Sequence, residues 1–265
     1  MKCAVVGLGE VGARYAAALA EAGNDVVGAD PADTTTPEGV VRVGSVAEAV
    51  DGAEVVLVMT SASVAPLVAE EALPVLAEGV CYADFTSSAP SQMRRLSELV
   101  GGTGAAFADV AILGPVPWHG AATPLMVSGP GGAVVADLLR PLGAPIDLLD
   151  EAAGAAMAHK LLRSVFMKGL ASLIGEAVAV GRAAGYEEWI RGQVAAALAG
   201  DGQAVIDRLL TGTQTHALRR MHEVDDAAGY LEELGVEPTM TRATVDSHRA
   251  VLARQAAPES ERQSA

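Results

Sequence analysis

Short apolar runs alternate with amphipathic stretches over the first 150 residues of the chain. Each run is short and almost continuously apolar, which is typical of a strand buried on both faces of a sheet. The runs expected to form strands are 2–6, 25–29, 40–43, 54–59, 80–84, 105–109, 124–128 and 146–149. The stretches with helical periodicity between them are 13–22, 45–50, 62–77, 90–100 and 133–140. Strands that alternate with helices predict a doubly wound parallel sheet.

The pattern changes after residue 150, where only helical periodicity remains. The expected helices are about 151–183, 187–199, 201–211, 214–234 and 239–256. We therefore predict an α/β domain over residues 1–150 and an all-α domain over residues 151–257. The tail, residues 258–265, is polar and is predicted to be disordered.

A glycine-rich turn joins the first predicted strand to the first predicted helix. Gly7 permits the tight turn, Gly9 has no Cβ and lets a pyrophosphate approach the backbone, and Gly12 lets the helix pack closely on the strand. The N-terminus of that helix faces the diphosphate. An ordinary glycine turn is the alternative, but the position between strand and helix favours a dinucleotide site formed by Gly7, Leu8, Gly9, Glu10, Val11 and Gly12.

Asp30 ends the second predicted strand, where a carboxylate accepts hydrogen bonds from the ribose hydroxyls of the adenosine. A carboxylate at this place repels a 2′-phosphate, so the sequence favours NAD as the cofactor, with NADP possible. Arg42 is the nearest residue that could offset the repulsion for NADP.

Polar residues follow several of the predicted strands. Because ligands of such sheets bind at the carboxyl ends of the strands, these residues are expected to line one edge. Each of them alone is more often a helix cap or a turn residue. The residues are Thr60, Ser61, Thr86, Ser87 and Asp109. We assign Thr60, Ser61 and Thr86 to the cofactor site.

Two lysines and a serine are spaced four residues apart on the long helix predicted at 151–183. This spacing places Lys160, Ser164 and Lys168 on one face. The rest of the helix is nearly all apolar, so we expect it to be buried, and buried lysines have a lowered pKa that suits proton transfer. The alternative is that both lysines reach solvent over their alkyl stems. We predict catalytic roles for all three residues.

The loop at 111–120 has the sequence AILGPVPWHG. It is interpreted either as a lid or substrate loop, or as a rigid turn that half buries Trp118.

The composition adds limits on partners. A formal net charge of -15 repels phosphate backbones and anionic lipid heads, which disfavours nucleic acid and membrane partners. Cys3 and Cys81 lie in predicted strands, which favours buried free thiols in a reducing compartment. With no leader segment apparent before the first strand, a cytoplasmic location is expected. The histidines lack the spacing of metal ligands, so no metal site is predicted.

Four segments carry a resemblance to the β-hydroxyacid dehydrogenase superfamily, which includes 6-phosphogluconate dehydrogenase. They are GLGEVG at 7–12, DFTSSAP at 84–90, DVAILGPVP at 109–117 and the glycine-to-lysine helix at 154–160. The resemblance covers essentially the whole chain. It implies a Rossmann domain followed by an all-helical domain, and commonly a homodimer or higher oligomer with the helical domain at the interface. It also implies the role of general acid or base for Lys160.

The chain departs from the family pattern at three positions. The family often has an asparagine where this chain has Ser164, and a serine in the substrate loop where it has Leu113. A lysine followed by an acid near the cofactor aligns with His222 and Glu223. These departures leave the substrate undetermined.

The sequence thus predicts an oxidoreductase that transfers hydride between a nicotinamide and a small anionic hydroxy acid or related alcohol. Candidate substrate residues are Gly114, His119, Arg163, Arg219 and His222. One alternative is imine reduction, although relatives with that activity usually have an acid or a tyrosine in place of Lys160. The other is a dinucleotide-binding protein without catalytic activity.

Overall fold

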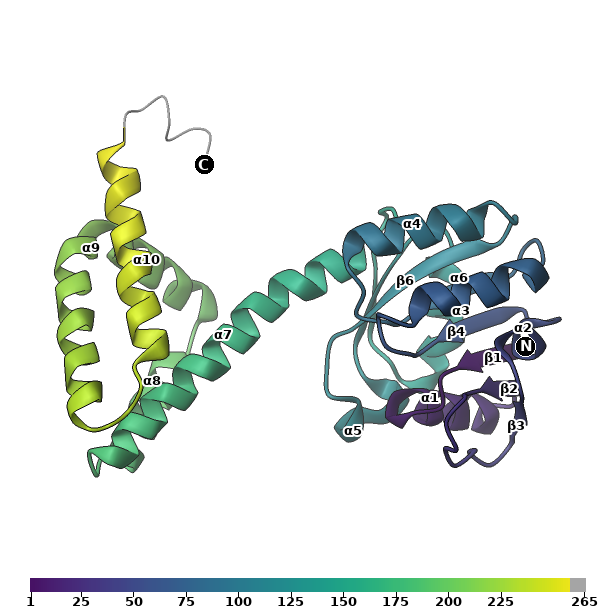
Figure 1. Cartoon of the computed structure of the whole chain (residues 1–265), viewed down its shortest axis with the longest axis horizontal. Coiled ribbons are helices and arrows are strands. Elements are labelled where there is room, and N and C mark those ends of the chain that lie inside the picture. Colours follow the sequence, from purple (N-terminus) through teal and green to yellow (C-terminus); the bar gives the residue numbers. More distant parts are fainter. Residues whose placement is uncertain (258–265) are drawn as a thin grey trace. The chain divides into compact units, whose positions relative to one another are not determined.

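The computed structural model describes residues 1–257, and the chain divides into two compact units after Arg163 (Figure 1). The first unit contains the whole sheet and the beginning of the long helix α7 (Ala155–Ala183), so it extends beyond residue 150. The second unit contains helices alone. The tail that the sequence predicts to be disordered, residues 258–265, lies outside the described residues.

The first unit is built on a twisted eight-stranded sheet with the strand order β3-β2-β1-β4-β5-β6-β7-β8. The strands are β1 (Lys2–Val6), β2 (Asp25–Ala29), β3 (Val40–Val43), β4 (Val55–Val58), β5 (Cys81–Asp84), β6 (Ala106–Ile112), β7 (Leu125–Ser128) and β8 (Ile146–Leu148). The order runs outward from β1 in both directions, which is the doubly wound arrangement that the alternating pattern predicts.

The sheet is parallel from β3 to β6, but β7 pairs antiparallel with β6. The sheet is therefore mainly parallel, as predicted, and β7 and β8, which are parallel to each other, run opposite to the other strands. The connection from β6 to β7 explains this, because it holds only the one-turn helix α5 (Val116–His119) and the 3-10 turn η2 (Gly120–Ala122). Such a short connection does not carry the chain back along the sheet, as a parallel crossover must.

Strand β6 is also longer than predicted. It continues to Ile112 because Asp109 through Ile112 pair with β7. Asp109 therefore lies inside the strand and is fully buried, whereas the sequence placed it at the strand's end.

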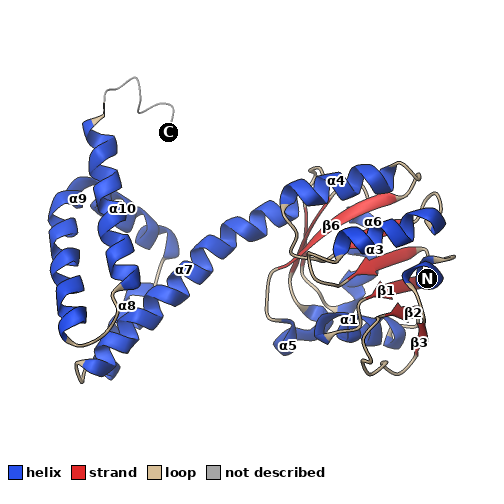
Figure 2. Ribbon diagram, in the orientation of Figure 1, coloured by secondary structure: helices blue, strands red, loops and turns tan. Residues whose placement is uncertain are grey.

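Helices cover both faces of the sheet (Figure 2). One core cluster joins the sheet to α2 (Val46–Val50), α3 (Ala65–Ala72) and α4 (Pro90–Gly101), and the other joins it to α1 (Glu10–Glu21) and α6 (Gly132–Leu139). Two further 3-10 turns are η1 (Leu73–Val75) and η3 (Arg140–Leu142). Apolar side chains on alternate sides of each strand supply both clusters, which is why the runs are continuously apolar.

Both cysteines are buried and free, as the sequence predicts. Cys3 lies in β1 and Cys81 in β5.

The second unit contains the rest of α7 with α8 (Glu187–Leu198), α9 (Gly202–Glu233) and α10 (Thr239–Ala256). The sequence predicts two helices at 201–211 and 214–234, and α9 does consist of two helical segments that meet at a kink. The kink lies at His216, where φ is −124° and ψ is 24°, so the break falls later in the chain than predicted. Helices α9 and α10 pack against each other. The carboxylate of Glu176 on α7 accepts hydrogen bonds from the first backbone N–H groups of α10, at 2.6 Å from Met240 N and 2.8 Å from Thr241 N.

Helix α7 carries large apolar side chains that are exposed in the single chain. Leu162, Val165 and Phe166 are 71%, 76% and 63% exposed. The expectation that this helix is buried is wrong for one chain taken alone, and Lys168 is exposed as well. Among the described residues, α7 alone is both long and apolar enough to cross a membrane, and a core helix of a soluble protein meets the same two criteria.

Candidate functional site

The turn between β1 and α1 has the geometry of a diphosphate loop. Gly7 has a φ of +96°, in the left-handed region that favours glycine. A Cβ on Gly12 would lie 1.8 Å from the carbonyl oxygen of Gly7, so helix and turn approach as closely as the sequence predicts. A Cβ on Gly9 would meet nothing within 4 Å. Gly9 is also the N-cap of α1, without a side-chain cap, so the first N–H groups of the helix remain available to an anion.

Asp30 lies beside this turn at the end of β2. Its carboxylate accepts hydrogen bonds from Leu8 N at 2.7 Å and from Ala32 N at 2.8 Å. These bonds fix the side chain while leaving further lone pairs for hydroxyl donors. The loop after β2 is in turn held by Arg42, whose guanidinium donates to the backbone carbonyls of residues 30, 32 and 34.

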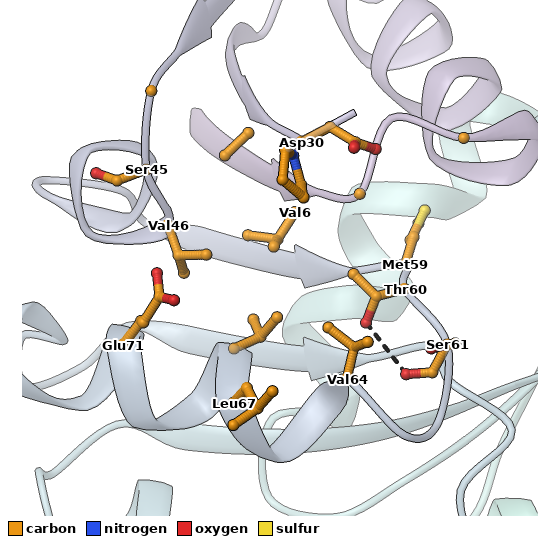
Figure 3. A pocket seen from close by; sticks show the side chains of 16 residues that line it. Val6, Asp30, Ser45, Val46, Met59, Thr60, Ser61, Val64, Leu67 and Glu71 are labelled. Carbon is orange, nitrogen blue, oxygen red and sulfur yellow. Dashed lines mark hydrogen bonds between the residues drawn. The ribbon is translucent and has the colours of Figure 1, made fainter. Parts of the chain in front are cut away.

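A cavity of about 550 Å³ opens between the glycine turn, β2 and α3 (Figure 3). Five of the predicted cofactor residues line it: Gly7, Gly9, Asp30, Thr60 and Ser61. Its remaining wall is largely apolar and includes Val46, Val64, Leu67 and Val68. An apolar slot with a carboxylate at one end and bare glycine backbone beside it fits the adenine, ribose and diphosphate of a dinucleotide.

A second cavity, of about 450 Å³, adjoins the first, because Met59 and Thr60 line both. It brings together residues predicted for three different roles: Val11 and Thr86 for the cofactor, Gly114 for the substrate and Lys160 for catalysis. All of them belong to the first unit.

Ser87 is the main residue of this cavity that the sequence analysis did not assign. Lys160 Nζ donates a hydrogen bond to Ser87 Oγ at 2.8 Å. Ser87 directly follows Thr86 at the end of β5, and that position was its one signal in the sequence. The contact itself joins residues 73 apart, so no local pattern reveals it.

Two buried carboxylates lie on β5 and β6, the strands whose carboxyl ends lead into the lining of this cavity. Asp84 and Asp109 are register partners on β5 and β6, and both are fully buried. Burial raises the pKa of Asp84 to about 6, against the opposing effect of its hydrogen bonds with Thr86. Burial also raises the pKa of Asp109, although hydrogen bonds and the charge of Lys160 act in the other direction.

The loop at 111–120 contributes Ile112, Gly114, Pro115, Val116 and Pro117 to the second cavity. Trp118 is 82% exposed, so the alternative of a turn with a half-buried tryptophan is wrong.

The other predicted residues lie elsewhere. His119 and Arg163 are exposed residues of the first unit that do not line either cavity. Ser164, Lys168, Arg219 and His222 belong to the second unit. Arg219 pairs with Glu223 at 2.8 Å.

Two family models match the chain. One, described as the NAD binding domain of 6-phosphogluconate dehydrogenase, matches residues 2–148. The other, a domain of unknown function (DUF1932), matches residues 182–251. A search of curated proteins gave no significant match.

Solved structures cover nearly all of the chain. A conserved hypothetical protein from Sinorhizobium meliloti 1021 is 27% identical, with a TM-score of 0.61 over 97% of this chain and 89% of its own. MTH1747, a protein of unknown function described as structurally similar to 3-hydroxyacid dehydrogenases, is 25% identical, with a TM-score of 0.63 over 97% of this chain and 100% of its own.

A reductive aminase from Aspergillus terreus, in complex with NADPH and ethyl-5-oxohexanoate, has a TM-score of 0.78 at 19% identity, over 95% of this chain and 93% of its own. At that identity the likeness concerns the fold alone. Other structures of this fold hold NAD+ or NADP+.

Proposed function

Because the chain belongs to the 6-phosphogluconate dehydrogenase-like superfamily and has its NAD-binding domain, we propose that it is an NAD-dependent oxidoreductase. Its substrate would be a small hydroxy acid or a related alcohol with an anionic group. The observation that carries the proposal is the hydrogen bond between Lys160 and Ser87 in the cavity that adjoins the dinucleotide loop.

The nicotinamide of the bound cofactor supplies or accepts the hydride, and the chain must move the accompanying proton. In reduction, the Lys160 ammonium donates a proton to the oxygen that develops negative charge. In oxidation, the neutral amine takes the proton of the substrate hydroxyl as the hydride leaves. Ser87 accepts a hydrogen bond from the amine, and in this proposal it also hydrogen-bonds the reacting oxygen of the substrate.

Asp30 supports the preference for NAD. Its fixed carboxylate lies in the cavity where the adenosine ribose would bind, and Glu71 lines the same cavity. A 2′-phosphate would bring further negative charge to this place. Arg42 is engaged by backbone carbonyls and does not line the cavity.

The substrate's anionic end needs positive charge beyond Lys160, because Lys160 is the single cationic residue among the described residues that line the second cavity. We infer that His119, Arg163 or residues of the helical domain supply it. The basic candidates there are Lys168, Arg219 and His222, and Ser164 is a candidate to hydrogen-bond the substrate. The exposed apolar side chains of α7 support a homodimer through this domain. In this proposal residues 1–150 bind the cofactor, and residues 151–257 serve substrate binding and dimerisation.

The buried free thiols support a cytoplasmic location.

The test combines binding and turnover. NADH and NADPH binding is measured by calorimetry, and turnover is assayed with hydroxy acids, related alcohols and cyclic imines. Lys160→Met should lower turnover by roughly 10²–10⁴-fold and leave NADH affinity unchanged. Lys2→Met is the matched control, since Lys2 lies on β1 and outside both cavities.

Three outcomes contradict the proposal. Near-full turnover by Lys160→Met removes Lys160 from the chemistry. Turnover of imines without hydroxy acids indicates imine reduction. Cofactor binding without turnover of any compound indicates a non-catalytic protein.

A further inference from the structure

The first turn of α7 is held by side chains that come from the sheet. Asp109 Oδ2 accepts hydrogen bonds from Gly154 N at 2.9 Å and from Met157 N at 3.1 Å. It also accepts one from Ser128 Oγ at 3.2 Å, and that hydroxyl accepts one from Ala156 N at 3.1 Å. Three of the N–H groups at the start of the helix are thus satisfied by β6 and β7.

The local sequence offers no such cap. The residues before α7 are Glu151, Ala152, Ala153 and Gly154, and no serine, threonine, asparagine or aspartate stands at the helix start. The cap comes from a carboxylate 45 residues earlier in the chain. A carboxylate at a helix N-terminus also interacts favourably with the positive end of the helix dipole.

The backbone at this point is fixed from a second side. Gly154 has a φ of +98°, and a Cβ on it would lie 2.6 Å from the carbonyl oxygen of Pro90. Pro90 begins α4 and follows the turn that contains Ser87. The start of α7 is therefore in contact with Asp109 on one side and with Pro90, which follows the turn that contains Ser87, on the other.

We infer that Asp109 is a positioning residue for Lys160. It fixes the first turn of α7 against the sheet, and the Lys160 side chain extends from the next turn to Ser87. This inference rests on the proposed role of Lys160. Its effect has two parts, a geometric one through hydrogen bonds and an electrostatic one through charge.

The electrostatic part depends on the groups that face Asp109. These are Asp84 from β5, Lys160 from α7 and, beside Gly154, the guanidinium of Arg94 from α4. Lys160 favours the ionised form of Asp109, and the interaction is reciprocal, so ionised Asp109 favours charged Lys160. Oδ1 of Asp109 has no hydrogen-bond partner among the described residues, which leaves this charge only partly compensated.

The titration of Lys160 can be followed without any substrate, because the chain has three lysines: Lys2, Lys160 and Lys168. Reductive methylation with ¹³C-formaldehyde gives each amine its own NMR signal. Lys2→Arg and Lys168→Arg assign the signals. The experiment compares the wild-type protein with Asp109→Asn, which removes the charge, and with Ser128→Ala. The second variant removes the hydrogen bond that caps Ala156 N and one of the hydrogen bonds that Asp109 accepts, but it keeps the carboxyl group.

We expect Asp109→Asn to lower the titration midpoint of Lys160 by on the order of one pH unit. The midpoints of Lys2 and Lys168 should not move. Ser128→Ala should leave the Lys160 midpoint in place while backbone amide exchange at Ala156 accelerates. A folded Asp109→Asn protein with an unchanged Lys160 midpoint would overturn the inference, and it would say nothing against hydride transfer.

If Asp109→Asn does not fold, the wild-type protein supplies the test. The Lys160 signal should show a second inflection, caused by the ionisation of the buried neighbouring carboxylate of Asp109, and this inflection should persist in Asp84→Asn. The Lys2 signal should show none at that pH. The absence of this inflection, or its loss in Asp84→Asn, would overturn the inference.

Discussion

At the scale of single residues, the site is defined by charges placed in apolar surroundings. Asp84 and Asp109 are fully buried in the sheet, and Asp30 lines the cavity that adjoins the one with Lys160. A buried charge is costly in free energy unless it has partners. Changes at these carboxylates should therefore alter stability or cofactor affinity, both of which can be measured.

The first prediction concerns Asp84, whose pKa is raised by burial from 3.8 to about 6. The folded protein binds this proton more tightly than the unfolded chain, so the contribution to stability is present at low pH and is lost as the pH rises from about 4 to about 6. Asp84→Asn should therefore stabilise the protein at pH 8 by on the order of 2 kcal/mol. In this variant the amide oxygen of the new side chain can still accept the hydrogen bond from Thr86 N.

Urea denaturation of both proteins at pH 4 and at pH 8 checks this prediction. The difference in unfolding free energy should be small at pH 4. An equal difference at both pH values would show that Asp84 does not titrate in this window.

The second prediction concerns cofactor choice. Asp30→Ser keeps a hydrogen-bond acceptor and removes the charge that repels a 2′-phosphate. The ratio of the NADPH and NADH dissociation constants should fall by about tenfold or more, which is about 1.4 kcal/mol. Fluorescence titration with both cofactors measures the ratio, and Glu71→Gln shows whether the second carboxylate of this cavity contributes. An unchanged ratio in Asp30→Ser would show that Asp30 does not select the cofactor.

At the scale of elements, the sequence predicted what depends on local pattern. Strands β1, β2 and β3 have the predicted bounds, because the ends of a short apolar run mark the ends of a buried strand. The glycine turn and Asp30 were predictable for the same reason, since their roles depend on spacing along one βαβ unit.

Features that depend on distant partners were not predictable. The direction of β7 follows from a short loop, and the length of β6 follows from that pairing. The cap on α7 by Asp109 and the bond from Lys160 to Ser87 join segments far apart in the chain. The apolar pattern of α7 shows that its side chains favour burial, but it does not show whether the same chain or another molecule covers them.

The third prediction concerns the start of α7. Gly154→Ala forces a Cβ into a left-handed residue and against the Pro90 carbonyl, so it should destabilise the protein by roughly 1–3 kcal/mol. Gly169→Ala is the control on the same helix, because a Cβ there meets nothing within 4 Å, and it should stabilise by roughly 0.5–1 kcal/mol. Thermal unfolding of both variants measures this. Equal effects would show that the first turn of α7 is not constrained.

At the scale of the whole molecule, the helical unit has a different surface from the sheet unit. Large apolar side chains are exposed along α7, α8 and α9, and they include Phe166, Trp189 and Leu210. Exposed apolar area of this kind marks a surface that another molecule covers. The net charge of -15 disfavours anionic lipid as that partner, and a second copy of the chain is the partner that we propose.

The fourth prediction follows from this surface. The wild-type protein should be a dimer in light scattering after size-exclusion chromatography. Phe166→Glu places a charge on the exposed apolar face of α7 and should convert the dimer to a monomer at micromolar concentration. Trp118→Glu, a matched change at an exposed residue of the first unit, should leave the dimer intact. A monomeric wild-type protein would contradict the proposed dimerisation domain.

The two buried thiols have a practical consequence. Burial raises the pKa of Cys3 to about 11 and that of Cys81 to about 12, so neither forms appreciable thiolate near neutral pH. Maleimide reagents should therefore ignore the native protein. A single cysteine introduced on its surface would accept a fluorophore or spin label without prior removal of the natural ones, and slow labelling of the wild type in urea would report how often its sheet opens.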